Sequence, residues 1–228
     1  MKLFLMEPIK LFLFKIKIKS KRKLMASQKM QKSGKVVVIG DGACGKTCLL
    51  EVFRRNTFPE AYIPTVVDNF AKDVTIEQNN SRRGGTTITL ALWDTAGQED
   101  YDTIRPLSYR ETDLVLICYT IENKKKIPNI SKKWLMEIKN YCPKAGYFLI
   151  GLKADLRSLN DPTLDKSAFI STEEGQEIAD SIKAEKFIEC SARTGENVNE
   201  VFKEAAKYIN ENKDGVNENA GCGFCFCC

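Results

Sequence analysis

The chain has 228 residues, enough for one domain of ordinary size with tails. It contains no histidine, which excludes histidine-based acid–base catalysis and histidine-ligated metals. The formal net charge of +5 is concentrated in residues 1–33, which sum to +9, so residues 34–228 sum to −4. A mildly acidic body argues against a nucleic-acid-binding protein, and no apolar run reaches the ~18 residues of a membrane-spanning helix.

The nine cysteines do not form the pattern of a disulfide framework. Four of them crowd the last seven residues, and the other five are scattered singly through segments that we expect in the core. We therefore expect the reducing environment of the cytosol. The five scattered cysteines are Cys44, Cys48, Cys118, Cys142 and Cys190.

Residues 1–33 form a basic and hydrophobic extension. Most of its charges follow the apolar run, whereas a signal peptide carries them before it. One interpretation is an arm that binds anionic membranes. The other, which we favour, is that translation begins at Met25 or Met30 and that this stretch is absent from the native protein.

The first motif is a glycine-rich segment at residues 40–47, which matches G-x-x-x-x-G-K-[ST], the phosphate-binding loop of nucleoside-triphosphate enzymes. A buried strand is predicted before it at 35–39 and a helix after it at 48–53. Backbone N–H groups and the helix dipole then point at the phosphates, which Lys46 would reach while Thr47 binds Mg²⁺. The alternative is a chance glycine-rich turn, and the complete context weighs against it.

A polar loop with two prolines is expected at residues 56–69. Alternating patterns then predict strands at 70–76 and 86–93, with a long polar hairpin turn at 78–85 between them.

Asp94 follows the third predicted strand, where a carboxylate is the expected holder of Mg²⁺ in a phosphate-loop enzyme. Gly97 would let its own N–H approach the γ-phosphate, and Gln98 could orient an attacking water.

The second half alternates strands with helices. The helix at 129–141 places Ile130, Trp134, Ile138 and Tyr141 at helical spacing, and Ser171 with Glu174 fits a capping box. Six strands in this order predict an α/β fold whose sheet is mostly parallel, with helices on both faces. The remaining expected segments are strands at 114–119, 148–152 and 187–190, helices at 171–182 and 197–210, a solvated loop at 124–126 and an irregular stretch at 156–170.

Residues 94–99, together with the phosphate loop, resemble the small GTPases of the Ras superfamily. The longer matches at 93–102 and 104–109 resemble the Rho/Rac subfamily, and so do the first switch at 62–70 and shorter matches at 132–134 and 141–143. The resemblance covers residues 34–210 as the GTPase domain, leaving 211–228 as a flexible tail. It implies the phosphate-loop NTPase (small G-protein) fold.

The resemblance also implies residue roles. Catalysis would fall to Gln98 and Lys46. Mg²⁺ would be held by Thr47, Thr65 and, through water, Asp94. Taken singly, Asp155 or Ser191 could be a helix cap and Tyr62 a surface aromatic, but their order and spacing favour nucleotide binding. The implied nucleotide-binding residues are Gly42, Ala43, Cys44, Gly45, Lys46, Thr47, Cys48, Phe58, Tyr62, Thr65, Gly97, Lys153, Asp155, Ser191 and Ala192.

Three features depart from the family pattern. Leu152 stands where an Asn or Thr is usual, so a polar tether between the base-binding and phosphate loops is lost. The stretch between Arg157 and Ser171 is shorter than the typical helical insert, which puts insert-dependent partners in doubt. A polybasic run before the terminal cysteines is also missing.

The tail offers lipidation sites, because Cys225 is fourth from the end, as C-a-a-X prenylation requires. Cys227 and Cys228 also resemble a double-cysteine ending, and Cys222 could carry a palmitoyl group as a second anchor. A four-thiolate zinc site is the competing interpretation.

The resemblance implies a GTP/GDP switch with slow hydrolysis, acting as a monomer with Mg²⁺ on the cytoplasmic face of membranes, the plasma membrane above all, and in the cytosol. Its partners would be an exchange factor, an activating protein that supplies an arginine, and effectors of the actin cytoskeleton; a dissociation inhibitor is a further candidate. Two other functions remain open, a nucleotide-holding scaffold that barely hydrolyses and a nucleic-acid-binding ATPase that uses the basic arm. Gln98 and Thr65 argue against the first, and Asp155 against the second.

Overall fold

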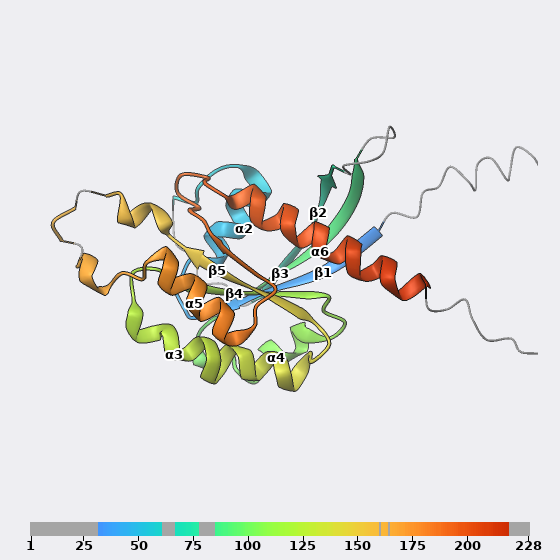
Figure 1. Cartoon of the computed structure of the whole chain (residues 1–228), viewed down its shortest axis with the longest axis horizontal. Coiled ribbons are helices and arrows are strands. Elements are labelled where there is room, and N and C mark those ends of the chain that lie inside the picture. Colours follow the sequence, from blue (N-terminus) through green and yellow to red (C-terminus); the bar gives the residue numbers. More distant parts are fainter. Residues whose placement is uncertain (1–31, 61–66, 78–84, 160, 164, 219–228) are drawn as a thin grey trace, which may run out of the picture. The chain divides into compact units, whose positions relative to one another are not determined.

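The computed structural model describes residues 32–60, 67–77, 85–159, 161–163 and 165–218 (Figure 1). The chain divides into two units, Met1–Lys32 and Ser33–Cys228. The sheet and its helices form the second unit. Residues 1–31 and the four tail cysteines lie outside the described residues, so the expectations on them remain predictions. The last two residues assigned to the basic extension, Lys32 and Ser33, are the start of the first strand.

One six-stranded sheet forms the centre of this unit, in the order β2-β3-β1-β4-β5-β6 (Figure 1). The β2–β3 pair is antiparallel, while β1–β4, β4–β5 and β5–β6 are parallel. Every residue of β4 is buried, as expected of a strand covered on both faces. The prediction of a mostly parallel sheet is confirmed. The strands are β1 (Lys32–Gly40), β2 (Val67–Ile76), β3 (Thr86–Thr95), β4 (Leu114–Thr120), β5 (Gly146–Leu152) and β6 (Lys186–Glu189).

Helices cover both faces of the sheet (Figure 1). Successive side chains of β1 point to opposite faces, so Val36 joins one buried cluster and Val37 the other. On the first face, Phe53 of one helix stacks on Phe202 of another with ring centroids 3.8 Å apart. Helices α2 (Lys46–Arg55) and α6 (Val198–Glu218) lie on that face, and α3 (Ile127–Asn129), α4 (Leu135–Tyr141) and α5 (Thr172–Ile182) on the other.

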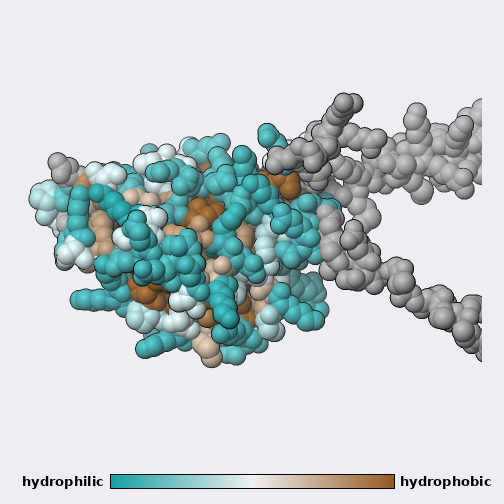
Figure 2. Space-filling view, viewed as in Figure 1, coloured by the Kyte–Doolittle hydropathy of each residue, from teal (hydrophilic) through white to brown (hydrophobic). Residues whose placement is uncertain are grey.

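The surface of this unit agrees with that arrangement. The side seen in Figure 2 is largely hydrophilic, with apolar residues in small separate groups. Among the described residues, no helix has both the length and the apolar character needed to cross a bilayer.

Several expected boundaries differ in the structure. The capping box of α5 is confirmed, with Ser171 and Glu174 exchanging hydrogen bonds of 3.1 and 2.8 Å. The last helix runs past Asn210 to Glu218, because Lys213 donates to the Ser33 carbonyl at 2.6 Å and to Asp113 at 3.0 Å. Strand β2 begins earlier than predicted because its pairing with β3 continues to the end of that strand.

The predicted helix at 129–141 is also interrupted. A π-helical turn at Ile130–Trp134 lies between α3 and α4 and shifts the helical phase of α4. Tyr141 shares the helical spacing of the buried Ile130, Trp134 and Ile138, but it is 54% exposed and stacks on Tyr109 with ring centroids 6.0 Å apart. The expected loop at Lys124–Lys126 is a 3₁₀ turn. Two more 3₁₀ turns, Ala154–Arg157 and Lys166–Ala168, overlap the stretch at 156–170 that was predicted to be irregular.

A buried ion pair fastens the segment after β3 to α4. The Arg105 side chain is 1% exposed and meets the Glu137 carboxylate through two hydrogen bonds of 3.0 and 2.6 Å. Tyr109 donates a third, at 2.6 Å, to the same carboxylate. Burial and this hydrogen bond raise the pKa of Tyr109 well above its usual range, so its hydroxyl remains a donor at neutral pH.

We predict that Glu137→Ala lowers the free energy of unfolding by about 3 kcal/mol, because the buried Arg105 guanidinium would lose two of its hydrogen bonds and keep the ion pair with Asp102. Chemical denaturation followed by circular dichroism measures this. Glu177→Ala, at an exposed position of α5, is the matched control and should change stability by less than about 0.5 kcal/mol. Equal effects of the two substitutions would show that the ion pair does not hold this segment.

Candidate functional site

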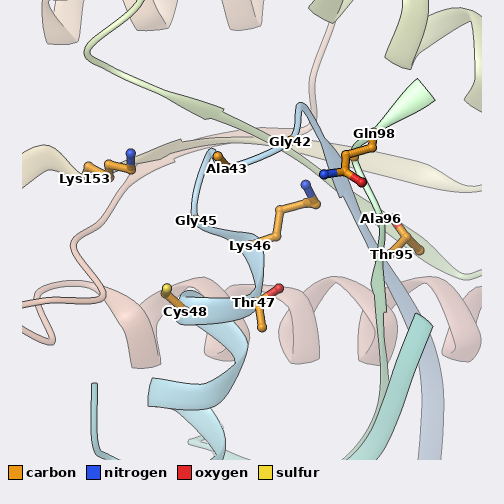
Figure 3. Close-up of a pocket in the computed structure, with 11 residues that line it drawn as sticks. Gly42, Ala43, Gly45, Lys46, Thr47, Cys48, Thr95, Ala96, Gln98 and Lys153 are labelled. Carbon is orange, nitrogen blue, oxygen red and sulfur yellow. The ribbon is translucent and has the colours of Figure 1, made fainter. Parts of the chain in front are cut away.

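The phosphate loop joins β1 to α2 at the carboxyl end of the strand, where parallel sheets bind ligands (Figure 3). Gly45 has φ +111°, a conformation that strongly favours glycine. At Gly40, with φ +144°, a Cβ would lie 2.1 Å from the Cys118 carbonyl oxygen. The sequence therefore builds a loop whose backbone amides are open to a ligand at the start of a helix.

A cavity of about 270 Å³ opens over this loop (Figure 3). Its walls come from the loop, the start of α2 and the segment after β3, with Lys153 from the far side. The lining residues are Gly42, Ala43, Gly45, Lys46, Thr47, Cys48, Thr95, Ala96, Gly97, Gln98 and Lys153.

Lys46 gives this cavity a positive charge. Its side chain is buried, and Nζ donates to the carbonyl oxygens of Gly40 at 2.7 Å and Asp41 at 2.9 Å. The loop therefore holds the ammonium group in place through its own backbone. A fixed cation beside open amides is an anion site.

Two oxygen-bearing side chains that could bind a metal ion lie next to each other at the edge of the cavity. The Thr47 hydroxyl at the start of α2 donates to the Asp94 carboxylate near the end of β3, at 2.6 Å. Asp94 is 5% exposed. A hydroxyl next to a carboxylate suits a hard cation such as Mg²⁺, which keeps water and phosphate oxygens as its other ligands. Among the described residues, no group of three or more Cys, Asp or Glu side chains could hold a metal.

Gly97, in the segment after β3, packs closely against the backbone of the phosphate loop. A Cβ at this position would lie 2.2 Å from the Gly40 carbonyl oxygen and 2.5 Å from the Asp41 carbonyl carbon. The next residue, Gln98, is exposed and lies beside Gly42, lining the same cavity as Lys46 (Figure 3). Glycine at 97 therefore brings Gln98 beside the phosphate loop.

A second, smaller cavity of about 140 Å³ adjoins the first and shares Gly45, Cys48 and Lys153 with it. The segments that follow β5 and β6 supply most of its lining, which also includes the half-exposed Phe58. The other lining residues are Leu152, Asp155, Leu156, Ala192 and Arg193.

Asp155 is fixed in this second cavity by Ser191. The Ser191 hydroxyl, which is fully buried, donates to the Asp155 carboxylate at 2.7 Å. The Ala154 N–H donates to the Cys190 carbonyl at 3.2 Å and ties the same two loops. Ser191 therefore supports the cavity from behind, while its neighbour Ala192 lines it.

Leu152 makes an apolar contact with the phosphate loop. It is buried, and its Cδ1 lies 3.6 Å from where a Cβ of Gly45 would stand.

Lys153 has φ +62° and forms an ion pair of 2.5 Å with Glu122, just after β4. Sequence reasoning missed Glu122, although its place after a parallel strand was a signal. It also missed the lining residues Leu156 and Arg193.

The remaining predicted site residues have different outcomes. Tyr62 and Thr65 lie outside the described residues. Cys44 is buried beneath the loop, and its side chain does not line either cavity. Burial raises the pKa of the Cys44 and Cys48 thiols, so both stay protonated at neutral pH.

Comparison with known proteins agrees with this geometry. The Ras family model matches residues 35–211. Over 179 residues the chain is 49% identical to the GTP-binding protein rho5 of Schizosaccharomyces pombe, covering 76% of this chain and 85% of that protein. It is 46% identical to the GTP-binding protein rho1 of the same organism, with 76% and 84% covered, and 45% identical to the GTP-binding protein RHO1 of Candida albicans, with 76% and 86% covered. The chain therefore belongs to the Ras family, as a Rho-type small GTPase that hydrolyses GTP.

Proposed function

We propose that this GTPase is a Mg²⁺-dependent switch in which the larger cavity holds the phosphates of GTP and the smaller one holds the guanine. The observation that carries the proposal is the meeting of Lys46, the Thr47–Asp94 pair and the Gly97–Gln98 segment around one cavity, with Asp155 in the next.

Guanine recognition rests on Asp155. Its carboxylate would accept from the guanine N1–H and exocyclic amine, a donor pair that adenine lacks. The Ser191 bond supports this role, because it fixes the carboxylate before the base arrives. The Ala192 N–H would donate to the guanine carbonyl, the Lys153 stem would lie along the base, and Phe58 would close the edge of the cavity.

Phosphate binding rests on Lys46 and the loop amides. Lys46 would exchange its two loop carbonyls for the β- and γ-phosphates. Thr47 and Thr65 would hold Mg²⁺ directly and Asp94 through water. When bound, Mg²⁺ neutralises charge that develops on the phosphates.

Hydrolysis rests on Gln98, whose amide would orient the attacking water. Positioning and charge stabilisation supply most of the rate in phosphoryl transfer. An arginine finger within the chain is disfavoured at Arg105, because that side chain is buried against Glu137. We therefore propose that an activating protein supplies one.

Signalling would depend on the two segments that contact the γ-phosphate, residues 57–69 and 95–110. Bound GTP would order them, and hydrolysis would release them. On the second segment, Leu107 is 79% exposed and Ile104 40%, which suits contact with an exchange factor, a dissociation inhibitor or effectors of the actin cytoskeleton. The GTPase would act as a monomer on the cytoplasmic face of membranes, through lipids on the tail cysteines.

We predict that Gln98→Leu slows single-turnover GTP hydrolysis at least tenfold, about 1.4 kcal/mol in the barrier, because the water loses its orienting group. GTP binding should stay nearly intact. Gln176→Leu, the same change at an exposed position of α5, is the matched control, and Thr47→Asn should instead weaken Mg²⁺-dependent GTP binding. Hydrolysis by Gln98→Leu within twofold of the parent would remove this residue from the mechanism.

We predict that Leu152→Asn slows the release of a fluorescent GDP. A new polar tether between the base-binding and phosphate loops is worth about 0.5–1.5 kcal/mol, or roughly twofold to tenfold in rate. Leu152→Met, which stays apolar, is the control and should leave release near the parent rate. Unchanged or faster release from Leu152→Asn would mean that another contact, such as the ion pair of Glu122 with Lys153, already fixes the base-binding loop without such a tether.

We predict that the tail cysteines carry membrane attachment and that the basic extension is dispensable. Deleting residues 1–24 should leave the membrane fraction unchanged. Replacing Cys222, Cys225, Cys227 and Cys228 with Ser should move the protein to the cytosolic fraction, because burial of lipid chains resists salt whereas surface charge does not. A truncated protein that leaves the membrane with its cysteines still lipidated would show that the extension contributes.

A further inference from the structure

Trp134 has a place in the fold that packing alone does not explain. It ends the π-helical turn at Ile130–Trp134 and is 1% exposed. Turns of this kind recur at functional sites, and a buried indole N–H needs an acceptor. Here the acceptor is a carboxylate oxygen of Asp41, at 3.1 Å.

Asp41 is an acidic residue inside an anion-binding loop, where its charge would repel a phosphate. Its carboxylate is instead bound by the helical segment at residues 127–134. Besides Trp134, the Asn129 amide donates to both of its oxygens, at 3.1 and 3.2 Å. These hydrogen bonds hold the Asp41 carboxylate against the helical segment and fix the position of Asp41 within the phosphate loop.

The ring face of Trp134 contacts Arg105, which in turn binds the Ala96–Gln98 segment on the other side of the cavity. The Arg105 guanidinium lies 4.7 Å from the Trp134 ring centroid and donates to the Ala96 carbonyl at 2.9 Å. Ala96 precedes Gly97, whose backbone packs directly on Asp41. Trp134 therefore contacts the phosphate loop directly through its N–H. It supports the Gly97–Gln98 segment indirectly, through the Arg105 guanidinium on its ring.

We propose that Trp134 is a positioning residue for GTP hydrolysis, which keeps the phosphate loop and the Gly97–Gln98 segment at a fixed spacing around the γ-phosphate. The inference rests on the proposed roles of Gly97 and Gln98. GDP has no γ-phosphate and does not bridge the two walls. Loss of the Trp134 hydrogen bond therefore affects the GTP state and its hydrolysis more than the GDP state.

The test is Trp134→Phe, which keeps an aromatic ring under Arg105 and removes the N–H. Single-turnover hydrolysis should slow by at least about threefold, since the lost hydrogen bond acts on the reacting atoms only through the phosphate loop. The affinity for a non-hydrolysable GTP analogue should fall by at least about threefold, while GDP affinity stays within about twofold. Trp93→Phe is the matched control, because it makes the same change at the other tryptophan. Trp93 lies on β3, where its ring contacts Lys35 of β1, and its substitution should leave hydrolysis near the parent rate.

A second variant tests the Trp134–Asp41 hydrogen bond at its acceptor. Asp41→Ala also removes the acceptor, so the Trp134→Phe substitution should add little to it; additive effects would indicate that the two residues act separately. Hydrolysis by Trp134→Phe within twofold of the parent overturns the proposal, whatever Gln98→Leu does. Equal losses of affinity for GDP and the GTP analogue overturn it too, because they indicate a purely structural role. A parent-like rate for Gln98→Leu counts instead against the proposed water-orienting role.

Discussion

The site depends on one close contact, between Gly97 after β3 and the backbone of the phosphate loop after β1. A Cβ at residue 97 would meet the Gly40 carbonyl oxygen at 2.2 Å, so a side chain here would force the two segments apart. The contact brings Gln98 to the cavity that Lys46 lines and sets the Thr47–Asp94 pair at its edge. The buried Arg105–Glu137 pair and Trp134 hold the same contact from the helix side.

The smaller cavity, which we propose for the base, is built differently from the larger one, which we propose for the phosphates. It joins two loops through the Asp155–Ser191 hydrogen bond, and Leu152 packs on the phosphate loop without a polar bond. Lys153 is held by Glu122 at the end of β4 instead. This anchor joins the base-binding loop to the sheet, whereas the usual tether would join it to the phosphate loop. Nucleotide release is therefore where this chain is expected to differ from a GTPase with Asn or Thr at residue 152.

Local patterns made much of this structure predictable. The phosphate loop, the six strands and the capping box at Ser171 are contiguous signals, and each was confirmed. The extension of α6 was missed because it depends on Lys213 bonding Ser33, 180 residues away in the sequence. The π-helical turn, the exposure of Tyr141 and the bond from Trp134 to Asp41 were missed for the same reason. They arise from packing between distant elements, which spacing along one segment does not encode.

We propose that the two adjoining cavities bind and hydrolyse GTP in preference to ATP. The most direct measurement is the competition of GTP and ATP for the full chain in Mg²⁺, with phosphate release followed in a single turnover. We expect GTP to bind and to be converted to GDP and phosphate, and ATP to compete at least about a hundredfold less well, a difference of about 2.7 kcal/mol. Binding of ATP within tenfold of GTP, or bound GTP that releases no phosphate, would contradict it.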